Sequence, residues 1–377
     1  MRQVYLAATG QNRGKTTVSL GLLAALIDRG LPTGFIKPVG QRYAMVDGVP
    51  ADEDAILVKH VFGLPDAPRD LSPVHIPRGF TKAFINGEVV EDLGARILEA
   101  YAAVSAGREV LLVEGTGHAG VGSVIGLSNA VVARMLGARA IIVSEAGVGR
   151  PIDEIVLNHA LFTRHGVDVV GAVVNKVDHE AHPTLSVTLE RGLALHGIEL
   201  LGVLPYVPLL SNPTLSVLLE QMPGELIHAG ADLDRPVEHV TIAAMRAEHA
   251  MQATQTGDLI IVPGDREDVI GAAASRSAVA RAEAVAAGGD PRRTGIAGLV
   301  LTGGYQPSPY LVDELRRADL FCYIVEHETY ATAERIHDLL VKTHPADTEK
   351  IEAIKTLVAE HLDLDRILER FSEPVAR

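Results

Sequence analysis

The sequence predicts an α/β protein with a mostly parallel sheet and a second, smaller α/β domain. Three observations lead to this prediction. Short runs of β-branched and apolar residues alternate with longer helical patterns, as strands alternate with crossover helices in a parallel sheet. The strand runs are almost continuously apolar, which indicates strands covered on both faces. A length of 377 residues is sufficient for two domains that each bury a core.

The first part of the chain carries most of the expected strands. Six runs predict strands at residues 4–8, 33–36, 110–113, 140–143, 169–174 and 200–203. Four stretches between them predict helices at residues 16–28, 92–106, 127–136 and 152–165. A proline-rich stretch at residues 202–213 then marks a boundary, so the first domain is expected to cover residues 1–212.

The second part repeats this alternation on a smaller scale. Strands are expected at residues 259–262, 298–301 and 321–325, and helices at residues 269–286, 310–317 and 331–340. These elements predict a second domain over residues 213–345. One amphipathic C-terminal helix is expected within residues 346–377, where it either covers a domain or pairs with another subunit.

Charge and composition exclude several classes of protein. The chain has 34 basic and 48 acidic residues, and this net charge of −14 argues against a nucleic-acid backbone or an anionic membrane as the main partner. No apolar run reaches the roughly 18 residues of a bilayer span, and the N-terminal residues lack the core of a secretory signal. The single cysteine, Cys322, excludes an intrachain disulfide and a cysteine-based zinc site. We therefore expect a cytoplasmic protein.

A glycine-rich loop joins the first predicted strand to the first predicted helix. Its sequence TGQNRGKTT, residues 9–17, matches the phosphate-loop (P-loop) pattern GxxxxGK[ST], except that Thr9 stands where the first glycine belongs. Lys15 is expected to reach the β and γ phosphates of a nucleotide, and the Thr16 hydroxyl to bind Mg²⁺. The whole predicted phosphate site consists of Asn12, Arg13, Gly14, Lys15, Thr16 and Thr17. The alternative is an ordinary strand-to-helix turn.

Acidic residues near this loop are candidates for the metal. Glu114 follows the strand at residues 110–113 and supplies the carboxylate that a phosphate loop needs for Mg²⁺. The run DEDAILV adds Asp54 as a second candidate metal ligand. Capping of a helix N-terminus explains Asp52 and Asp54 equally well, so both interpretations stay open.

Two further polar residues stand at the ends of predicted strands. Lys37, in FIKPVG, ends the second strand and is a candidate for neutralising a transferred phosphoryl group, so Lys15 and Lys37 are the candidate catalytic residues. The alternative for Lys37 is a solvated lysine. Asn175 ends another strand, where its amide can pair with the edge of an adenine.

Taken together, these residues resemble the dethiobiotin synthetase branch of P-loop ATPases over about residues 1–210. The resemblance rests on GKTT, KPV, VEGTG and GVLP, together with Asp54 and Asn175. It implies ATP and Mg²⁺ as cofactors, and a homodimer. The roles that it implies are phosphate binding by Lys15 and Lys37, adenine recognition by Asn175, and Mg²⁺ binding by Thr16, Asp54 and Glu114.

The second domain carries a motif of its own. Its letters come from two separate segments and are Asp265, Arg266, Thr302, Gly303 and Gly304, the residues that name the DRTGG domain. The arrangement of both domains resembles the N-terminal regulatory part of long bacterial phosphate acetyltransferases, and also stand-alone proteins described as BioD-like ATPases. The glycines predict either a backbone nest for an anion beside Arg266 or a tight turn with an Asp265–Arg266 pair.

Three functions follow from these motifs. The first is an Mg-ATP-dependent enzyme that hydrolyses ATP or phosphorylates a small carboxylate. The second is a non-catalytic regulatory protein that senses a nucleotide or a metabolite. The third is dinucleotide binding, since GTGHAG at residues 115–120 matches GxGxxG and Glu145 ends the next strand. His118, within that loop, is a further candidate for a role in catalysis.

Overall fold

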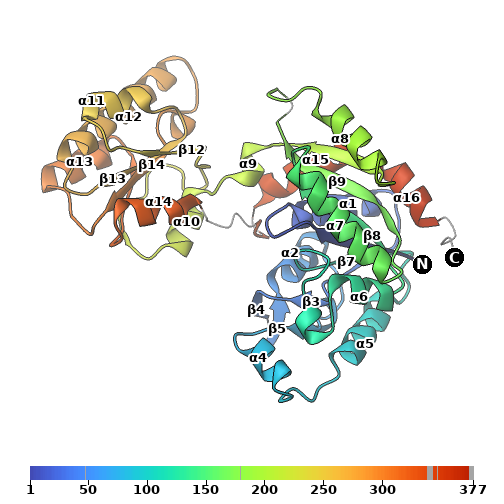
Figure 1. Ribbon diagram of the computed structural model, residues 1–377. Helices are drawn as coiled ribbons and strands as arrows, with labels where there is room; N and C mark the ends of the chain where they lie inside the picture. Colours follow the sequence, from blue (N-terminus) through green and yellow to red (C-terminus); the bar gives the residue numbers. More distant parts are fainter. Residues whose placement is uncertain (47, 179, 338–342, 346, 373–377) are drawn as a thin grey trace. The chain divides into compact units, whose positions relative to one another are not determined.

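The computed structural model describes every residue except 47, 179, 338–342, 346 and 373–377. The contacts divide the chain into two compact units, residues 1–207 with 343–377 and residues 208–342 (Figure 1). Parts of two predicted helices, residues 338–340 and 373–377, lie outside the described residues. None of the described helices combines the length and the apolar character that crossing a bilayer requires.

A six-stranded sheet forms the centre of the first unit. All its neighbouring strands are parallel, in the order β10-β9-β8-β1-β7-β2. The strands are β1 (Arg2–Ala8), β2 (Thr33–Ile36), β7 (Val110–Glu114), β8 (Arg139–Glu145), β9 (Val169–Val177) and β10 (Leu200–Pro205). All six predicted strands are present. Because β1 lies between β7 and β8, the loop that follows it emerges between the carboxyl ends of those two strands.

Helices and short strands surround this sheet. The helices are α1 (Lys15–Asp28), α2 (Glu53–Phe62), α3 (Pro68–Leu71), α4 (Phe80–Ile85), α5 (Leu93–Ser105), α6 (Asn129–Met135), α7 (Arg150–Arg164) and α8 (Leu185–Ala194), with a 3-10 turn at Ser123–Ile125. Four short strands were not predicted from the sequence. They are β3 (Val39–Gly40), which pairs with β6 (Val74–His75), and the hairpin of β4 (Tyr43–Val46) and β5 (Val49–Asp52). Strands of two to four residues are too short to show a period of two.

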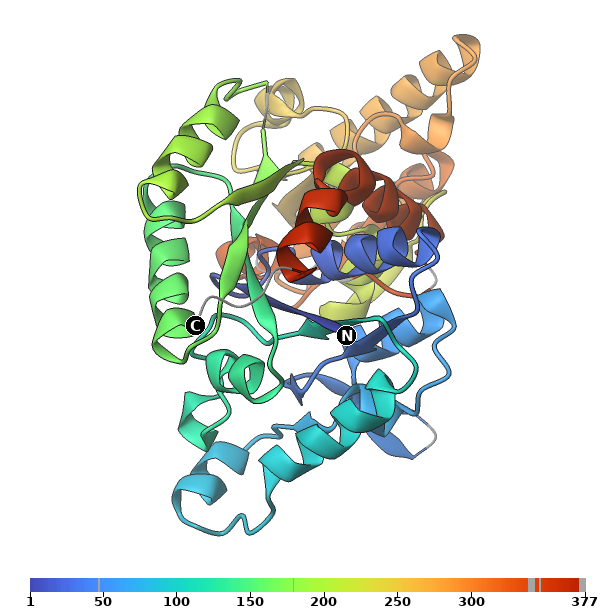
Figure 2. The same cartoon turned by 90° about the vertical axis from the view of Figure 1, so that its right-hand side faces the viewer.

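The C-terminal segment belongs to the first unit, and the prediction of one helix there was wrong. Two helices form instead, α15 (Thr348–His361) and α16 (Leu364–Ser372); between them Leu362 bridges Gly202 of β10, and the Asp363 side chain accepts the Arg366 backbone N–H at 3.0 Å. Figure 2 shows these red helices beside the blue helix α1. A Cβ at Gly21 of α1 would lie 2.3 Å from the Val358 side chain, so glycine permits this close approach. The segment therefore covers the first unit's own sheet.

The second unit has a five-stranded sheet in the order β11-β15-β14-β13-β12, parallel except for the pairing of β11 with β15. The strands are β11 (Glu225–His228), β12 (His239–Ile242), β13 (Asp258–Pro263), β14 (Gly298–Thr302) and β15 (Phe321–Ile324). The helices are α9 (Pro208–Ser211), α10 (Leu215–Gln221), α11 (Ala247–Ala253), α12 (Glu267–Ala286), α13 (Pro309–Arg317) and α14 (Thr329–His337), with a 3-10 turn at Pro291–Arg293.

The two edge strands of this sheet, β11 and β12, were not predicted. Each has four residues and lies largely at the surface, so its sequence, ELIH or HVTI, lacks a long apolar run. The three inner strands were predicted, because both their faces are covered by apolar clusters. Cys322 of β15 is fully buried in one of these clusters, as a structural thiol.

Candidate functional site

The predicted phosphate loop lies at the carboxyl end of β1 and leads directly into α1. Gly14 forms the N-cap of α1 at φ 90°, and Asn12 also has a positive φ of 57°. A Cβ at Gly14 would lie 1.9 Å from the Asn175 amide nitrogen, so only glycine fits at this position. Lys15, Thr16 and Thr17 occupy the first turn of α1, where backbone N–H groups have no helical partner. The predicted strand, loop and helix are thus adjacent.

Residues from β8 and β9 hold the outer side of this loop. Arg13 forms an ion pair with Glu145 at the end of β8. Lys176 Nζ donates to the Asn12 carbonyl oxygen at 3.1 Å, and to a Glu145 carboxylate oxygen at 3.0 Å. The Asn175 amide donates to the Arg13 carbonyl oxygen at 3.3 Å. These contacts fix the loop. Lys176 was not predicted from the sequence, because only the order of strands in the sheet brings it next to Asn12 and Glu145.

Lys15 is the cation of the loop that remains available for a ligand. Its ammonium makes no hydrogen bond or ion pair with any residue within the described part of the chain. Its side chain is partly exposed, so a ligand can reach it. Burial lowers the pKa of Lys15, and the positive charge of Lys37 lowers it further, against the opposing effect of nearby carboxylates such as Glu114. A negatively charged phosphate oxygen near this ammonium would favour its charged form and raise the pKa again.

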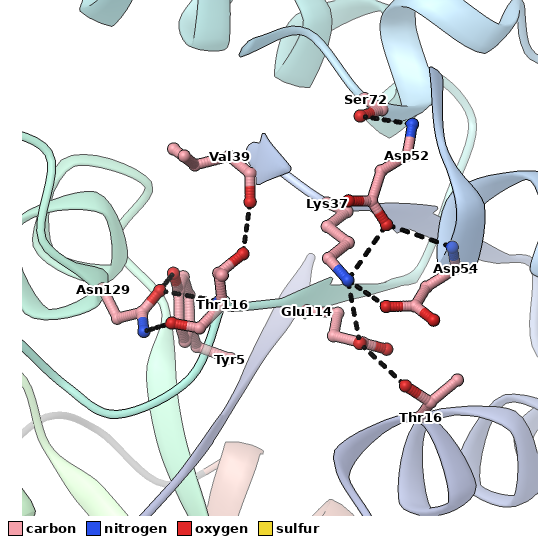
Figure 3. A network of polar contacts seen from close by, with 10 residues as sticks. All are labelled: Tyr5, Thr16, Lys37, Val39, Asp52, Asp54, Ser72, Glu114, Thr116 and Asn129. Carbon is pink, nitrogen blue, oxygen red and sulfur yellow. Dashed lines mark hydrogen bonds and ion pairs between the residues drawn. The ribbon is translucent and has the colours of Figure 1, made fainter. Parts of the chain in front are cut away.

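Lys37 lies in the opposite situation, because three carboxylates surround its ammonium (Figure 3). It is only 7% exposed and forms ion pairs with Asp52 at 3.0 Å, with Glu114 at 3.5 Å, and with Asp54. Thr16 donates its hydroxyl to Glu114 at 3.3 Å, which joins this group to the phosphate loop. The structure therefore brings together Thr16, Lys37, Asp54 and Glu114, as the sequence predicted, and adds Asp52.

Burial and neighbouring charges shift the pKa values of Lys37, Asp54 and Glu114. Burial would lower the pKa of Lys37, but the three carboxylates, Asp54 foremost, raise it above its usual range. Burial would raise the pKa of Asp54, yet the Lys37 ammonium and its hydrogen bond lower it. Burial raises the pKa of Glu114, and the Asp54 carboxylate adds to that rise, against the opposing effect of Lys37. Lys37 is thus a buried, paired cation, and the alternative of a solvated lysine was wrong.

Asp52 confirms the capping interpretation for its own side chain. Its Oδ1 accepts the Asp54 backbone N–H at 3.0 Å, so it is the N-cap of α2. The same oxygen lies 3.0 Å from the Lys37 ammonium. Capping and charge pairing therefore coexist at Asp52, while the Asp54 side chain points to Lys37 and caps nothing. A Ser72 hydroxyl accepts the Asp52 backbone N–H and fixes the start of the helix.

The group has features that suit a bound Mg²⁺. Glu114 is completely buried, and its Oε2 has no hydrogen-bond partner among the residues that the structure describes. Three carboxylates surround a single ammonium, so the negative charge is in excess. Among the described residues, no three His, Cys, Asp or Glu side chains form a ready-made metal site. Mg²⁺ usually needs only one or two carboxylates, with waters and substrate phosphates completing its shell, so the residues fit.

A buried network holds the loop that follows Glu114. Asn129 donates to the Thr116 and His118 carbonyl oxygens at 2.8 and 2.7 Å, and its Oδ1 accepts the Tyr5 hydroxyl at 2.8 Å. The Thr116 hydroxyl donates to the Val39 carbonyl oxygen, two residues after Lys37 (Figure 3). This contact ties the loop after β7 to β3, which follows Lys37. Sequence spacing gave no signal for Asn129, which lies at the start of α6.

The dinucleotide interpretation does not fit this loop. A dinucleotide fingerprint requires a helix that begins within the glycines, but here the next α-helix begins at Asn129, after a 3-10 turn. Glu145, the proposed ribose ligand, pairs with Arg13 and Lys176 instead. His118 is exposed, and its Nδ1 accepts the Gly120 backbone N–H at 3.2 Å.

The glycine turn of the second unit is closed to an anion. The Gly303 N–H donates to the His327 carbonyl oxygen, and the Gly304 N–H to the Val325 carbonyl oxygen, both at 3.0 Å. Arg266 pairs with Asp268 at 2.9 Å, and not with Asp265. Both sequence interpretations need correction: the turn is tight, as one of them held, but its donors are already used, and the arginine has a different partner.

Comparison with known proteins supports the two-part organisation. Residues 2–214 match the family model described as an AAA domain, and residues 217–339 match the model described as a DRTGG domain. Phosphate acetyltransferase from Nitrosomonas europaea is 26% identical, with 99% of this chain and 52% of that protein aligned. The phosphate acetyltransferase from Pseudomonas aeruginosa is 27% identical, covering 99% of this chain and 53% of that protein. The chain thus spans about half the length of these relatives.

Among solved structures, the cell division protein FtsY from Thermotoga maritima matches with a TM-score of 0.37 and 15% identity. That match covers 54% of this chain and 61% of the other. The family matches confirm the expected arrangement, a P-loop domain followed by a DRTGG domain, within a chain whose whole length resembles part of phosphate acetyltransferases.

Proposed function

The chain belongs to the AAA domain family, with a DRTGG domain beside it, and from this premise we propose that it binds Mg-ATP at the phosphate loop and hydrolyses it or transfers its γ-phosphoryl group to a small carboxylate. One observation carries the proposal. Lys15, at the start of a helix, presents an ammonium without an ion-pair partner among the described residues, and the buried Glu114, whose charge acts on Lys15, has an Oε2 without a hydrogen-bond partner among the same residues. A cation and an anion placed in this way suit a phosphate with its metal.

The residues of the loop have distinct tasks in this proposal. Lys15 and the first N–H groups of α1 bind the phosphates, and Asn175 contacts the adenine. Thr16, Asp54 and Glu114 would hold Mg²⁺, which neutralises phosphate charge when it is bound. The attacking oxygen, from water or from a carboxylate, forms a bond to the γ-phosphorus as the bond to ADP breaks. Lys37 stabilises the charge on the transferred group if its carboxylates release it.

A thermal-shift and calorimetry series tests the nucleotide site. ATP, ADP, GTP and NAD are each added with Mg²⁺ to the full chain and to Lys15→Ala. We expect adenine nucleotides to stabilise the wild-type protein and to lose this effect in the variant, because a phosphate-binding charge is gone. Stabilisation by NAD alone, unchanged in Lys15→Ala, would contradict the assignment.

A second candidate function is nucleotide sensing without turnover. Lys37 favours it, because its ammonium is enclosed by three carboxylates and is not free to meet a phosphoryl group. Almost the whole chain is similar to about half the length of phosphate acetyltransferases, and this also supports a regulatory module. In this form the phosphate site would bind ATP and pass its state to a partner.

Single-turnover measurements separate the two functions. Radiolabelled ATP is mixed with excess protein, alone and with a panel of small carboxylates, and ADP and phosphate are followed. Turnover that rises with one carboxylate supports the enzyme, whereas tight binding with intact ATP supports sensing. From the family resemblance we also propose a homodimer, which sedimentation velocity tests as a species of twice the 40.1 kDa chain mass.

A further inference from the structure

A second pocket lies in the first unit, away from the phosphate loop. It has a volume of about 340 Å³ and is bounded by α2, the β4–β5 hairpin and α3. The size falls within the range of small-molecule sites. Its walls are largely apolar and include Val46, Ala51, Ala55, Ile56, Leu64 and Leu71. Transfer of a hydrocarbon group from water into this pocket would therefore be favourable.

The pocket is separated from the candidate phosphate site by α2 itself. At about 100° per residue, the four α2 residues that line the pocket lie about 100 to 240° around the helix from Asp54. These residues are Ala55, Ile56, Lys59 and His60. Asp54 contacts Lys37 on the other side. A ligand in the pocket would thus occupy a different face of the helix from the nucleotide.

Among the described residues that line the pocket, only Lys59 carries a fixed charge. Its ammonium donates to the carbonyl oxygens of Leu64 at 2.7 Å and Asp66 at 2.8 Å. An ammonium has three N–H donors, so one is left over. No carboxylate lies within ion-pair distance of Lys59 in the described part of the chain, and the nearby Asp66 carboxylate is paired with Arg108 at 3.1 Å. The two carbonyls therefore fix a cation that no carboxylate of the described residues pairs with.

We propose that this pocket binds a small monocarboxylate with an aliphatic or aromatic body. The apolar walls accept the body, and Lys59 pairs with the carboxylate, which also satisfies its third N–H. His60, at the exposed rim, offers a second polar contact. A phosphate ester is a poorer match, because one lysine leaves most of its oxygens unpaired. This site is additional to the proposed phosphate site and does not depend on it.

Titration calorimetry of the full chain with sodium octanoate tests the proposal, with octylamine and 1-octanol as probes of the same length. We expect octanoate to bind at least about tenfold more tightly than octanol, because a charge-assisted hydrogen bond is added. Octylamine should bind more weakly still, since its charge repels Lys59. Octylamine binding as tightly as octanoate, or no binding of octanoate at millimolar concentration, would overturn the proposal.

Variants locate the bound octanoate. Ile56→Phe adds volume at a half-buried wall position and should abolish binding, while Lys59→Met should weaken octanoate by about tenfold and leave octanol unchanged. Lys59→Arg should restore part of the loss. Lys15→Ala is the matched control and should leave octanoate binding intact, even though it removes ATP binding. Octanoate binding lost in Lys15→Ala but kept in Ile56→Phe would place the carboxylate at the phosphate loop and reject this pocket. Thermal unfolding of each variant without ligand verifies that it is folded.

Discussion

Each unit of this protein has a glycine-rich turn where a parallel strand ends, yet the two turns treat their hydrogen-bond donors differently. In the first unit, Gly14 caps α1 and the Lys15 ammonium has no ion pair within the described residues. In the second unit, the N–H groups of Gly303 and Gly304 bond to carbonyl oxygens of residues 325 and 327. Its arginine, Arg266, is taken by Asp268.

This difference teaches that glycines at a strand end are not enough for an anion site. Both turns use positive φ angles that glycine adopts without strain. Only the first leads straight into a helix, whose first N–H groups have no helical acceptor. The second leads through a short loop to α13, and its N–H groups donate to carbonyl oxygens of the segment that follows β15. An anion site requires free donors in addition to the glycine motif.

The largest test of this contrast is Lys15→Ala against Arg266→Ala. We expect Lys15→Ala to weaken ATP binding about 100-fold, because a charge-assisted contact is lost. Arg266→Ala should leave ATP binding unchanged. Isothermal titration measures both. Without ligand, Lys15→Ala should unfold at the same temperature as the wild type or higher, since burial of this ammonium is unfavourable. Equal loss of ATP binding in both variants would remove the contrast.

Glu114→Gln tests the acidic side of the first turn. The change keeps the shape of the side chain but removes a buried charge, so the gain in ATP affinity on adding Mg²⁺ should fall about tenfold or more. Glu145→Gln is the matched control, because Glu145 pairs with Arg13 and Lys176 and belongs to the outer side of the loop. The measurement is ATP affinity with and without Mg²⁺. A Mg²⁺ effect that survives Glu114→Gln would exclude Glu114 as a ligand.

Gly303→Ala tests the structural turn. Gly303 has φ +83°, and a Cβ there would lie 2.9 Å from the Tyr305 ring. We expect a loss of about 1 to 2 kcal/mol in the stability of the second unit, with ATP binding unchanged. The rate at which Cys322 reacts with a thiol reagent measures opening of this unit, since the thiol is buried. Gly289→Ala, at a glycine without positive φ, should have little effect.

Asp52 variants separate capping from charge at the first unit's site. Both Asp52→Asn and Asp52→Ala remove the ion pair with Lys37, but asparagine keeps a capping oxygen. Asp52→Ala should therefore be less stable than Asp52→Asn by about 1 kcal/mol in chemical denaturation. Equal stability of the two variants would mean that the hydrogen bond to the Asp54 N–H contributes nothing measurable.

The smallest expected effect concerns Cys322 and pH. Burial raises the pKa of the Cys322 thiol from 9.0 to about 12. Above pH 9 the folded state therefore keeps this proton while the unfolded state releases it. The contribution of the protonated thiol to the free energy of unfolding is complete below pH 9 and is lost as the pH rises toward 12. Relative to Cys322→Ala, the wild type should lose roughly 0.8 kcal/mol between pH 8 and 9.5. Parallel stability curves for the two proteins would contradict this.

Much of the fold could be predicted because local sequence encodes it. The six strands of the first sheet and the three inner strands of the second are almost continuously apolar, because both faces of each strand are covered. The short edge strands β11 and β12 were not predicted, because much of each strand faces solvent and its sequence lacks an apolar run. The terminal segment was mispredicted as one helix: its break lies at Leu362, which bridges β10, and at Asp363, whose side chain accepts the Arg366 backbone N–H at the start of the second helix. Amphipathic periodicity alone does not report such a contact.

The sequence by itself determined the phosphate loop, the position of Lys15 at the start of α1, and the strand ends that carry Lys37 and Glu114. Spacing is sufficient for these, because each residue follows its own strand. Only the tertiary structure decided that β7 lies between β1 and β2, which places Glu114 between Thr16 and Lys37. It also decided which donors stay free, because a hydrogen-bond partner is chosen by contacts between segments far apart in the chain.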